Sequence, residues 1–173
     1  MDSGIIYRKA TAQDVVKLSI LFKQVYIQTY GVDGVSDEFA NFIVRHFSME
    51  NLEKKIASYP DNIIVAVYHD NLVGVVEIEF GKTCPVLNIL AAEINKLYIL
   101  ERFCGKGIGY NLLRNAEETV RAKGINKIWL LVFDQNDRAI AFYERQNYKH
   151  IGEANDQMEV NNYTNKVMLK RLY

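Results

Sequence analysis

A glycine-rich segment near the middle of the chain places the strongest constraint on its fold. Residues 102–110 read Arg-Phe-Cys-Gly-Lys-Gly-Ile-Gly-Tyr. The preceding residues Ala91–Leu100 have the pattern of a strand, and Ile108–Lys123 carries apolar residues at helical spacing. Lys127–Phe133 follows as a strand with the composition of a buried one. The glycines therefore join a strand to a helix in a fold that mixes both.

The rest of the chain supplies further strands and helices. We expect a strand at Ile5–Lys9, an amphipathic helix after Thr11, helices at Asp37–Phe47, Met49–Ala57 and Asn136–Gln146, and strands at Ile63–Tyr68, Leu72–Phe80, Lys149–Glu153 and Thr164–Leu172. Ser36 and Ser48 are the expected helix caps, and Asp70-Asn71 predicts a two-residue hairpin loop. The pattern indicates a mixed α/β sheet with helices on both faces, in a single domain over residues 1–173.

Composition excludes several classes of protein. Lysine plus arginine and aspartate plus glutamate each number 21, and this balance argues against a nucleic-acid binder. A run of about 18 apolar residues, which would span a membrane, does not occur in the sequence. The N-terminus lacks the basic start and apolar core of a secretory signal. The two cysteines and three scattered histidines predict a reduced, cytoplasmic protein without a metal.

The glycine-rich turn can be interpreted in several ways. Backbone N–H groups at the start of a helix bind anions, and Lys106 and Arg102 add positive charge, so the turn suits a phosphate or pyrophosphate. A P-loop is excluded because its glycine–lysine pattern does not occur. A dinucleotide fingerprint requires glycine where Tyr110 stands, although Asp134 could imitate its ribose-binding acid. A turn that binds nothing is the remaining alternative.

A second motif follows the Lys127–Phe133 strand. Its members are Asn136, Ala139, Phe142, Tyr143 and Tyr148. Together with Cys104–Gly109, this order resembles the GCN5-related N-acetyltransferase (GNAT) superfamily, whose acetyl-CoA loop reads [RQ]-x-x-G-x-[GA]. Cys104 stands where the family usually has arginine or glutamine, and Asn147 stands where it usually has glycine. Because the backbone amides of the loop remain, we expect weakened rather than lost cofactor binding.

The N-terminal part is similar to a narrower group. Tyr26–Gly31 and Phe47–Glu53 resemble bacterial PaiA-type spermidine/spermine N-acetyltransferases. The resemblance implies a mixed, mostly antiparallel central sheet of six to seven strands, with the N-terminal helices over the acceptor site. It also implies transfer of an acetyl group from acetyl-CoA to a primary amine such as a polyamine, with no metal, and it leaves room for a homodimer.

The resemblance also implies roles for individual residues. The expected acetyl-CoA contacts are Leu97, Tyr98, Ile99, Gly105, Lys106, Gly107, Ile108, Gly109, Tyr110, Asn136 and Tyr143. Tyr143 is the expected general acid for the departing thiolate. Glu93 is the candidate general base, although a solvated strand carboxylate is an equal alternative. Acidic residues that could bind ammonium groups of the acceptor are Asp33, Asp37, Glu38 and Glu93.

Other interpretations stay open beside this one. Cys104, near a helix N-terminus, could form an acyl-enzyme. Glu77 and Glu79 share a strand face and could attract a cationic amine, although exposure to solvent is the more ordinary interpretation. The acceptor could instead be a protein N-terminus or another small amine. A CoA-sensing module without catalysis and a nicotinamide-dependent oxidoreductase are the alternatives outside acyl transfer.

Overall fold

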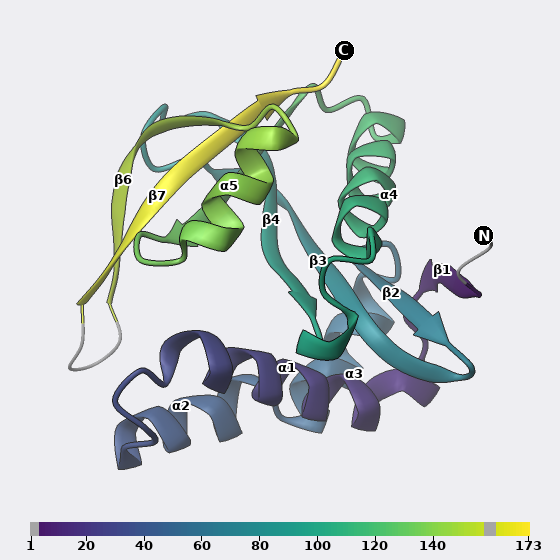
Figure 1. The fold of residues 1–173 in the computed structure, drawn as a ribbon. Helices are drawn as coiled ribbons and strands as arrows, with labels where there is room; N and C mark the ends of the chain where they lie inside the picture. The colour runs from purple at the N-terminus through teal and green to yellow at the C-terminus, as the bar shows by residue number, and fades with distance from the viewer. Residues whose placement is uncertain (1–3, 158–161) are drawn as a thin grey trace. The chain divides into compact units, whose positions relative to one another are not determined.

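The computed structural model of the protein describes residues 4–157 and 162–173 (Figure 1). Its elements are β1 (Ile5–Lys9), η1 (Ala12–Asp14), α1 (Val15–Tyr30), α2 (Asp37–His46), α3 (Met49–Ser58), β2 (Ile63–Tyr68), β3 (Asn71–Thr83), β4 (Leu90–Ile99), η2 (Glu101–Phe103), α4 (Ile108–Ala122), β5 (Lys127–Phe133), α5 (Asp137–Arg145), β6 (Lys149–Gln157) and β7 (Asn162–Arg171). Within the described residues the strands form a seven-stranded sheet in the order β1-β2-β3-β4-β5-β7-β6. The pair β4–β5 is parallel, whereas β1–β2, β2–β3, β5–β7 and β6–β7 are antiparallel. The expected mixed, mostly antiparallel α/β fold is confirmed.

The chain divides into two compact units. Unit 1 consists of residues 1–77 and 96–115, and unit 2 consists of residues 78–95 and 116–173. The boundaries fall inside β3, β4 and α4, so each unit contains parts of the sheet and a part of α4.

Helices lie on both faces of the sheet within unit 1. Tyr98 of β4 contacts Phe22 of α1, with ring centroids 5.9 Å apart. Its neighbour Ile99 faces Gly74 of β3, where an added Cβ atom would lie 3.2 Å from Ile99 and 3.1 Å from Leu112 of α4. Because successive side chains of a strand point to opposite faces, α1 and the beginning of α4 cover opposite faces here. This part of the expectation is also confirmed.

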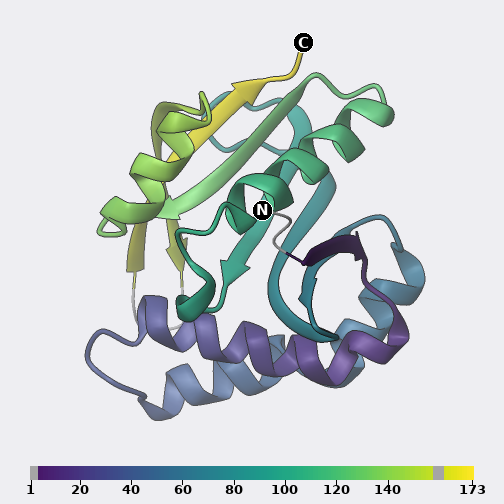
Figure 2. The same cartoon turned by 45° about the vertical axis from the view of Figure 1, so that its right-hand side comes forward.

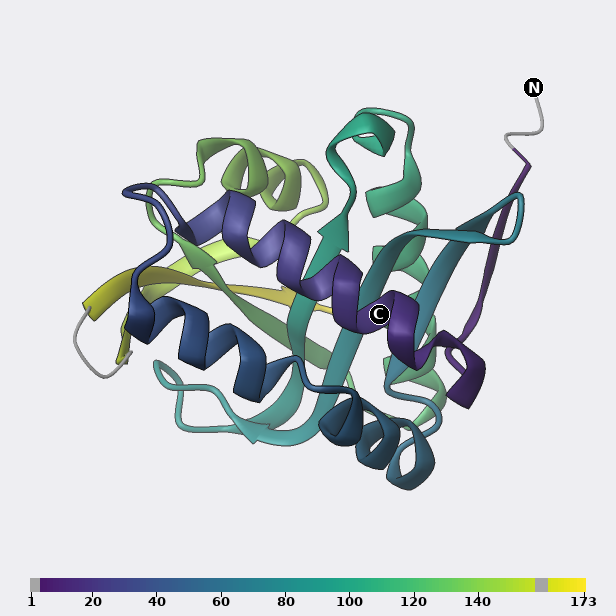
Figure 3. The same ribbon diagram turned by 90° about the horizontal axis from the view of Figure 1, so that it is seen from below.

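Serine caps begin α2 and α3, as the sequence predicts. Ser36 Oγ accepts a hydrogen bond from the Phe39 N–H at 3.2 Å, and Ser48 Oγ accepts one from the Asn51 N–H at 3.3 Å. Each cap satisfies an N–H group that has no partner inside the helix. Figure 3 shows α2 lying alongside α1, which it joins through the loop after Tyr30.

The chain enters α1 through a buried acidic residue. Thr11 begins the short helix η1 rather than α1 itself. Asp14 is 1% exposed, and its carboxylate accepts hydrogen bonds from the Thr11 N–H at 2.8 Å and from the Arg8 guanidinium at 2.7 and 2.9 Å. These bonds, chiefly those from Arg8, lower the pKa of Asp14 from 3.8 to about 2.

The β2–β3 hairpin differs from the prediction by one residue. Tyr68 pairs with Asn71, so the two-residue loop is His69-Asp70 and not Asp70-Asn71. His69 and Asp70 have φ values of 45° and 63°, the left-handed pair that a type I′ turn requires. Asn71 starts β3, and its side-chain amide donates a hydrogen bond to the His69 carbonyl at 2.8 Å.

Unit 2 is built on β5, β6 and β7. Figures 1 and 2 show α5 covering one face of these strands. A buried cluster contains Cys84, Ala91, Trp129, Val167 and Leu169. Trp129, the sole tryptophan of the chain, is 4% exposed, and its indole N–H has no hydrogen-bond partner among the described residues. Asn147, after α5, has a φ of 66°, which confirms its predicted left-handed conformation.

Candidate active site

The glycine-rich turn lies in unit 1 between β4 and α4. Gly105 and Gly107 have φ values of 76° and 78°, which residues with a side chain rarely adopt. A Cβ atom added to either glycine would meet no heavy atom of the described residues within 4 Å. The backbone of the turn is therefore open on that side, and a ligand could approach it closely.

The first turn of α4 adds backbone donors to this loop. Ile108 is 2% exposed and anchors the start of the helix in the core. The Asn111 N–H donates a hydrogen bond to the Gly107 carbonyl at 3.1 Å. The N–H groups of Ile108, Gly109 and Tyr110 come before it and have no acceptor inside the helix. With the helix dipole, these N–H groups could bind an anion, so the anion site that the sequence predicts stays a prediction.

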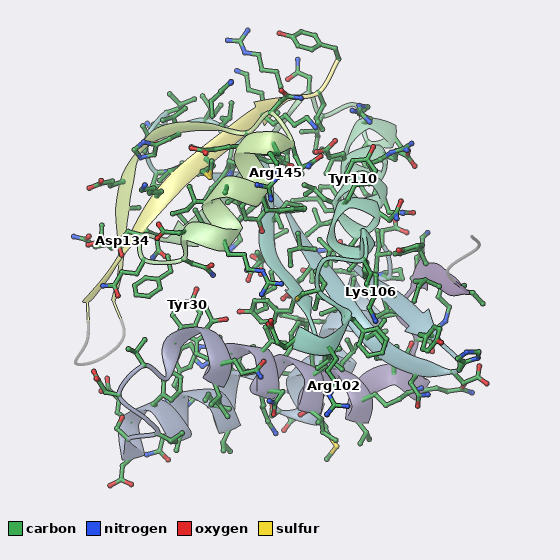
Figure 4. The ribbon with its side chains drawn as sticks, viewed as in Figure 1. Tyr30, Arg102, Lys106, Tyr110, Asp134 and Arg145 are labelled. Atoms are coloured by element: carbon green, nitrogen blue, oxygen red, sulfur yellow. The ribbon has the colours of Figure 1, made fainter. Side chains whose placement is uncertain are left out.

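Basic side chains stand beside the turn. Arg102 and Lys106 are exposed, on η2 and in the loop that follows it (Figure 4). The Lys106 ammonium lies 5.0 Å from the centroid of the Phe103 ring, within the range of a cation–π contact. The Phe103 ring in turn lies 5.8 Å from that of Tyr68. Positive charge is therefore held near the open glycines.

The Cys104 thiol is directed toward β4. Its Sγ lies 3.8 Å from the Leu100 carbonyl oxygen and 3.9 Å from that of Ile99, as a weak donor to both. The turn therefore offers backbone amides and Lys106 to an anion, while the thiol contacts carbonyl groups at the end of the strand.

The three expected acetyl-CoA contacts on β4 also belong to unit 1. Leu97, Tyr98 and Ile99 are partly buried at the end of β4. The parallel pairing of β4 with β5 covers Ala92–Ile94, in unit 2, so these three residues lie farther along the strand. Unit 1 thus brings them together with Gly105, Lys106, Gly107, Ile108, Gly109 and Tyr110.

The expected catalytic residues Glu93 and Tyr143 belong to unit 2, as does Asn136, an expected acetyl-CoA contact. Glu93 is partly buried on β4 and is in register with Trp129 of β5. Asn136 is the N-cap of α5, where its side-chain oxygen accepts a hydrogen bond from the Ala139 N–H at 3.1 Å. Tyr143 of α5 is 7% exposed, and its ring packs edge-on against that of Tyr148 at 5.7 Å.

Tyr148 belongs to a buried polar cluster that sequence reasoning missed. Its hydroxyl donates a hydrogen bond to Glu117 Oε1 at 3.1 Å, and Lys170 Nζ donates to both oxygens of Glu117 at 2.8 and 2.9 Å. Burial, followed by the Glu117 charge, raises the pKa of Tyr148 well above its ordinary value. The Tyr148 hydroxyl is therefore held by Glu117 in the interior of unit 2. The sequence indicated the burial of Glu117 only through its position next to Ala116, which belongs to the apolar stripe of α4.

Glu77 is buried, although the sequence favoured solvent exposure for it. It is 3% exposed and forms ion pairs with Lys55 of α3 and with Lys96 of β4, the latter at 3.0 Å. Burial alone would raise the pKa of Glu77, but the ammonium groups of Lys96 and Lys55 outweigh it and lower this pKa below its ordinary value. Glu79 is partly buried and accepts a hydrogen bond from Asn95 at 2.8 Å. Hydrophobic alternation could not identify the two lysines that hold Glu77.

Two further features are absent from the described residues. In residues 4–157 and 162–173, no group of three or more histidine, cysteine, aspartate or glutamate side chains could hold a metal ion. None of the helices in the same residues is long and apolar enough to pass through a membrane.

Comparison with known sequences identifies relatives of this chain. The sequence profile of the acetyltransferase (GNAT) family matches residues 32–148. The spermidine N(1)-acetyltransferase of Thermoplasma acidophilum is 27% identical over 152 residues, which cover 84% of this chain and 89% of that protein. An uncharacterized N-acetyltransferase of Chlorobaculum tepidum is 31% identical over 104 residues, which cover 60% of this chain and 57% of the other.

Solved structures share the fold. The PaiA N-acetyltransferase from Thermoplasma acidophilum, in complex with coenzyme A, superposes with a TM-score of 0.80 at 24% identity and covers 96% of this chain and 98% of that one. Ard1 from Thermoplasma volcanium superposes with a TM-score of 0.72 at 15% identity, covering 98% and 99%. At these identities the likeness shows a common fold.

Proposed function

The chain belongs to the acetyltransferase (GNAT) family and is an acyltransferase, and on that premise we propose that it transfers the acetyl group of acetyl-CoA to a polyamine such as spermidine or spermine. The open backbone of the glycine-rich turn carries this proposal. Gly105 and Gly107, both at positive φ, leave room for the pyrophosphate of coenzyme A against the first N–H groups of α4. Lys106 would then neutralise part of its charge.

The reaction follows from the residues expected at the site. Glu93 accepts a proton from the acceptor ammonium, so that a neutral amine nitrogen can attack the thioester carbonyl. The new carbon–nitrogen bond forms, the carbon–sulfur bond breaks, and coenzyme A leaves as a thiolate. Tyr143 donates its phenolic proton to that sulfur, and the phenolate regains a proton from the acylated nitrogen through solvent, which leaves a neutral amide. Holding the reactants together supplies much of the rate enhancement.

The thiol of Cys104 has no part in this scheme. A covalent route would need it as a nucleophile, yet its Sγ is directed toward the Ile99 and Leu100 carbonyl oxygens. We therefore propose direct transfer. Cys104→Ala should retain full turnover, and a burst of acyl-enzyme that disappears in this variant would show the covalent route instead.

Two observations support a polyamine as the acceptor. A relative that matches 84% of the chain is named a spermidine N(1)-acetyltransferase. The loop between α1 and α2 and the start of α2 also carry acidic residues, of which Asp33 and Asp37 are exposed and Glu38 is partly buried. Carboxylates at these positions would attract a polycation. Acetylation of a protein N-terminus or another small amine remains the second candidate.

Calorimetry and an acceptor screen test the proposal. The protein should bind acetyl-CoA in preference to NAD, and it should release thiol with spermidine faster than with aminoglycosides or peptides with a free N-terminus. Failure of the folded protein to bind either CoA or acetyl-CoA at millimolar concentration would refute the assignment. Binding of acetyl-CoA without transfer to any amine would point to a CoA-sensing module. A reaction that consumes acetyl-CoA also fits the cytoplasmic location predicted from the sequence.

A further inference from the structure

A cluster of aromatic side chains joins α1 to α2 in unit 1. We call it the α1–α2 aromatic cluster, and its members are Tyr26, Tyr30, Phe39, Phe42 and Phe47. The ring of Tyr26 is central, with its centroid 4.6 Å from that of Tyr30, 5.6 Å from Phe39, and 5.3 Å from both Phe42 and Phe47. Rings at these separations attract each other beyond the area they bury. The cluster therefore fixes the end of α1 against α2.

Tyr30 is the ring of this cluster best placed to contact a small molecule. Phe39 and Phe47 are buried, whereas Tyr26, Tyr30 and Phe42 are partly exposed. Tyr26 is packed between its neighbours, and the ring of His46 stacks on Phe42 at 3.8 Å. Figure 4 shows Tyr30 projecting from the C-terminal end of α1.

The edge of the cluster already holds a primary ammonium group. Lys96 Nζ lies 5.8 Å from the centroid of Phe47 and 6.0 Å from that of Phe22, and Glu77 accepts its hydrogen bond at 3.0 Å. A cation within about 6 Å of a ring centroid is attracted by the negative face of the ring. These rings, with a carboxylate beside them, therefore accommodate the chemical group that a polyamine carries.

The charge of the neighbouring chain matches a cation. The residues from Gly31 to Glu38 include Asp33, Asp37 and Glu38 and no basic residue. Acidic groups of this kind raise the local concentration of a polycation, while the ring of Tyr30 offers it a face. A neutral alkyl group would gain only contact area from the same surface.

We propose that Tyr30 is a specificity-determining residue of the acceptor site, where its ring binds the ammonium group of a diamine or polyamine that is not acetylated. This inference rests on the proposed function, because it states how that reaction chooses its acceptor. The reacting nitrogen must be neutral to attack a thioester, whereas the distant nitrogen stays protonated at neutral pH. A ring that recognises positive charge thus selects the distant end and leaves the other end to react.

A pair of acceptors tests the inference with the unaltered protein. One acceptor is (aminopropyl)trimethylammonium, and the other is its neutral isostere, with carbon in place of the quaternary nitrogen. Neither terminal group donates a hydrogen bond, and each kcat/KM is referred to the concentration of the neutral amine form, because a nearby cation changes the pKa of the reacting amine. We expect kcat/KM to be roughly three- to thirty-fold higher for the cationic acceptor. Equal values for the two acceptors would overturn the inference.

Variants then test whether Tyr30 causes the preference for the cationic acceptor. Tyr30→Leu should lower the ratio of the two kcat/KM values several-fold without changing the KM for acetyl-CoA, and Tyr30→Phe, which keeps a ring, should retain the preference. Tyr59→Leu is the matched control, because Tyr59 is 60% exposed at the end of α3. A purely structural role of Tyr30 would lower both values equally, and an unchanged ratio in Tyr30→Leu would refute its role.

The two proposals fail in different ways. If the unaltered protein acetylates no amine, the proposed function is wrong and the inference fails with it. If it acetylates both acceptors at equal kcat/KM, the function stands and the role of Tyr30 is refuted.

Discussion

Substitution of Gly107 by alanine should separate the binding role of the glycine-rich turn from its role in folding. Gly107 has a φ of 78°, a conformation that costs a residue with a side chain about 1–2 kcal/mol. The new methyl group would point into space that is open in the described residues, so we expect no steric cost beyond this. On the proposed function the same space receives the pyrophosphate. Loss of one charge-assisted hydrogen bond there should weaken acetyl-CoA binding by about 1.5–3 kcal/mol, roughly ten- to a hundred-fold in Kd.

Gly124 provides the matched control for this experiment. It follows α4 with a φ of 74°, and an added Cβ atom would likewise meet no described atom within 4 Å. Gly124→Ala should therefore lower the free energy of unfolding by a similar amount, measured by urea denaturation. Calorimetry should show weakened acetyl-CoA binding in Gly107→Ala alone. Equal Kd values for the two variants would refute the assignment of the turn as the pyrophosphate site.

Further substitutions test individual side chains. Tyr143→Phe should lower kcat about a hundred-fold while calorimetry finds the acetyl-CoA affinity nearly unchanged; unchanged turnover would remove Tyr143 from the mechanism. Asp14→Asn should lower the free energy of unfolding by about 2 kcal/mol at neutral pH. The folded-state pKa of Asp14 is depressed to about 2, so this difference should disappear as the pH falls from about 4 toward 2, and a difference independent of pH would contradict the ion pair. Glu77→Leu should destabilise the protein by about 3 kcal/mol in urea denaturation, because it leaves Lys96 and Lys55 without their carboxylate. Replacing Lys96 by methionine in the same chain should recover part of the loss, and no recovery would show that the Glu77–Lys96 pair is not the cause.

Most element positions could be predicted because hydrophobic spacing and local chemistry agree. Lys127–Phe133 matches β5 at both ends, since an apolar run bounded by turn residues leaves little choice. The C-terminal end of β6 was harder to predict, although its start at Lys149 matches. That strand continues to Gln157 through polar residues such as Asn155, and backbone pairing with β7 requires no apolar side chain. Periodicity in the sequence therefore ended before the strand did.

In the candidate site, too, local features could be predicted and tertiary contacts could not. The glycine-rich turn could be predicted because positive φ values favour glycine, and the structure places Gly105 and Gly107 at such angles. The partners of Glu77 could not be predicted, since Lys55 is 22 residues away in the chain and approaches it only through tertiary packing. The same holds for Lys170, which lies 53 residues from Glu117. The spacing of charges in a sequence does not determine which of them meet in a folded core.

The buried indole of Trp129 can serve as an internal fluorescence probe of unfolding. As the sole tryptophan, it emits from the interior of unit 2, while the helices α1 to α3 of unit 1 dominate a circular dichroism signal. Loss of the two signals at the same urea concentration would indicate one cooperative transition, as expected for a single domain. Separate transitions would mean that one of the two units, which carry Gly107 and Tyr143 respectively, can melt while the other stays intact.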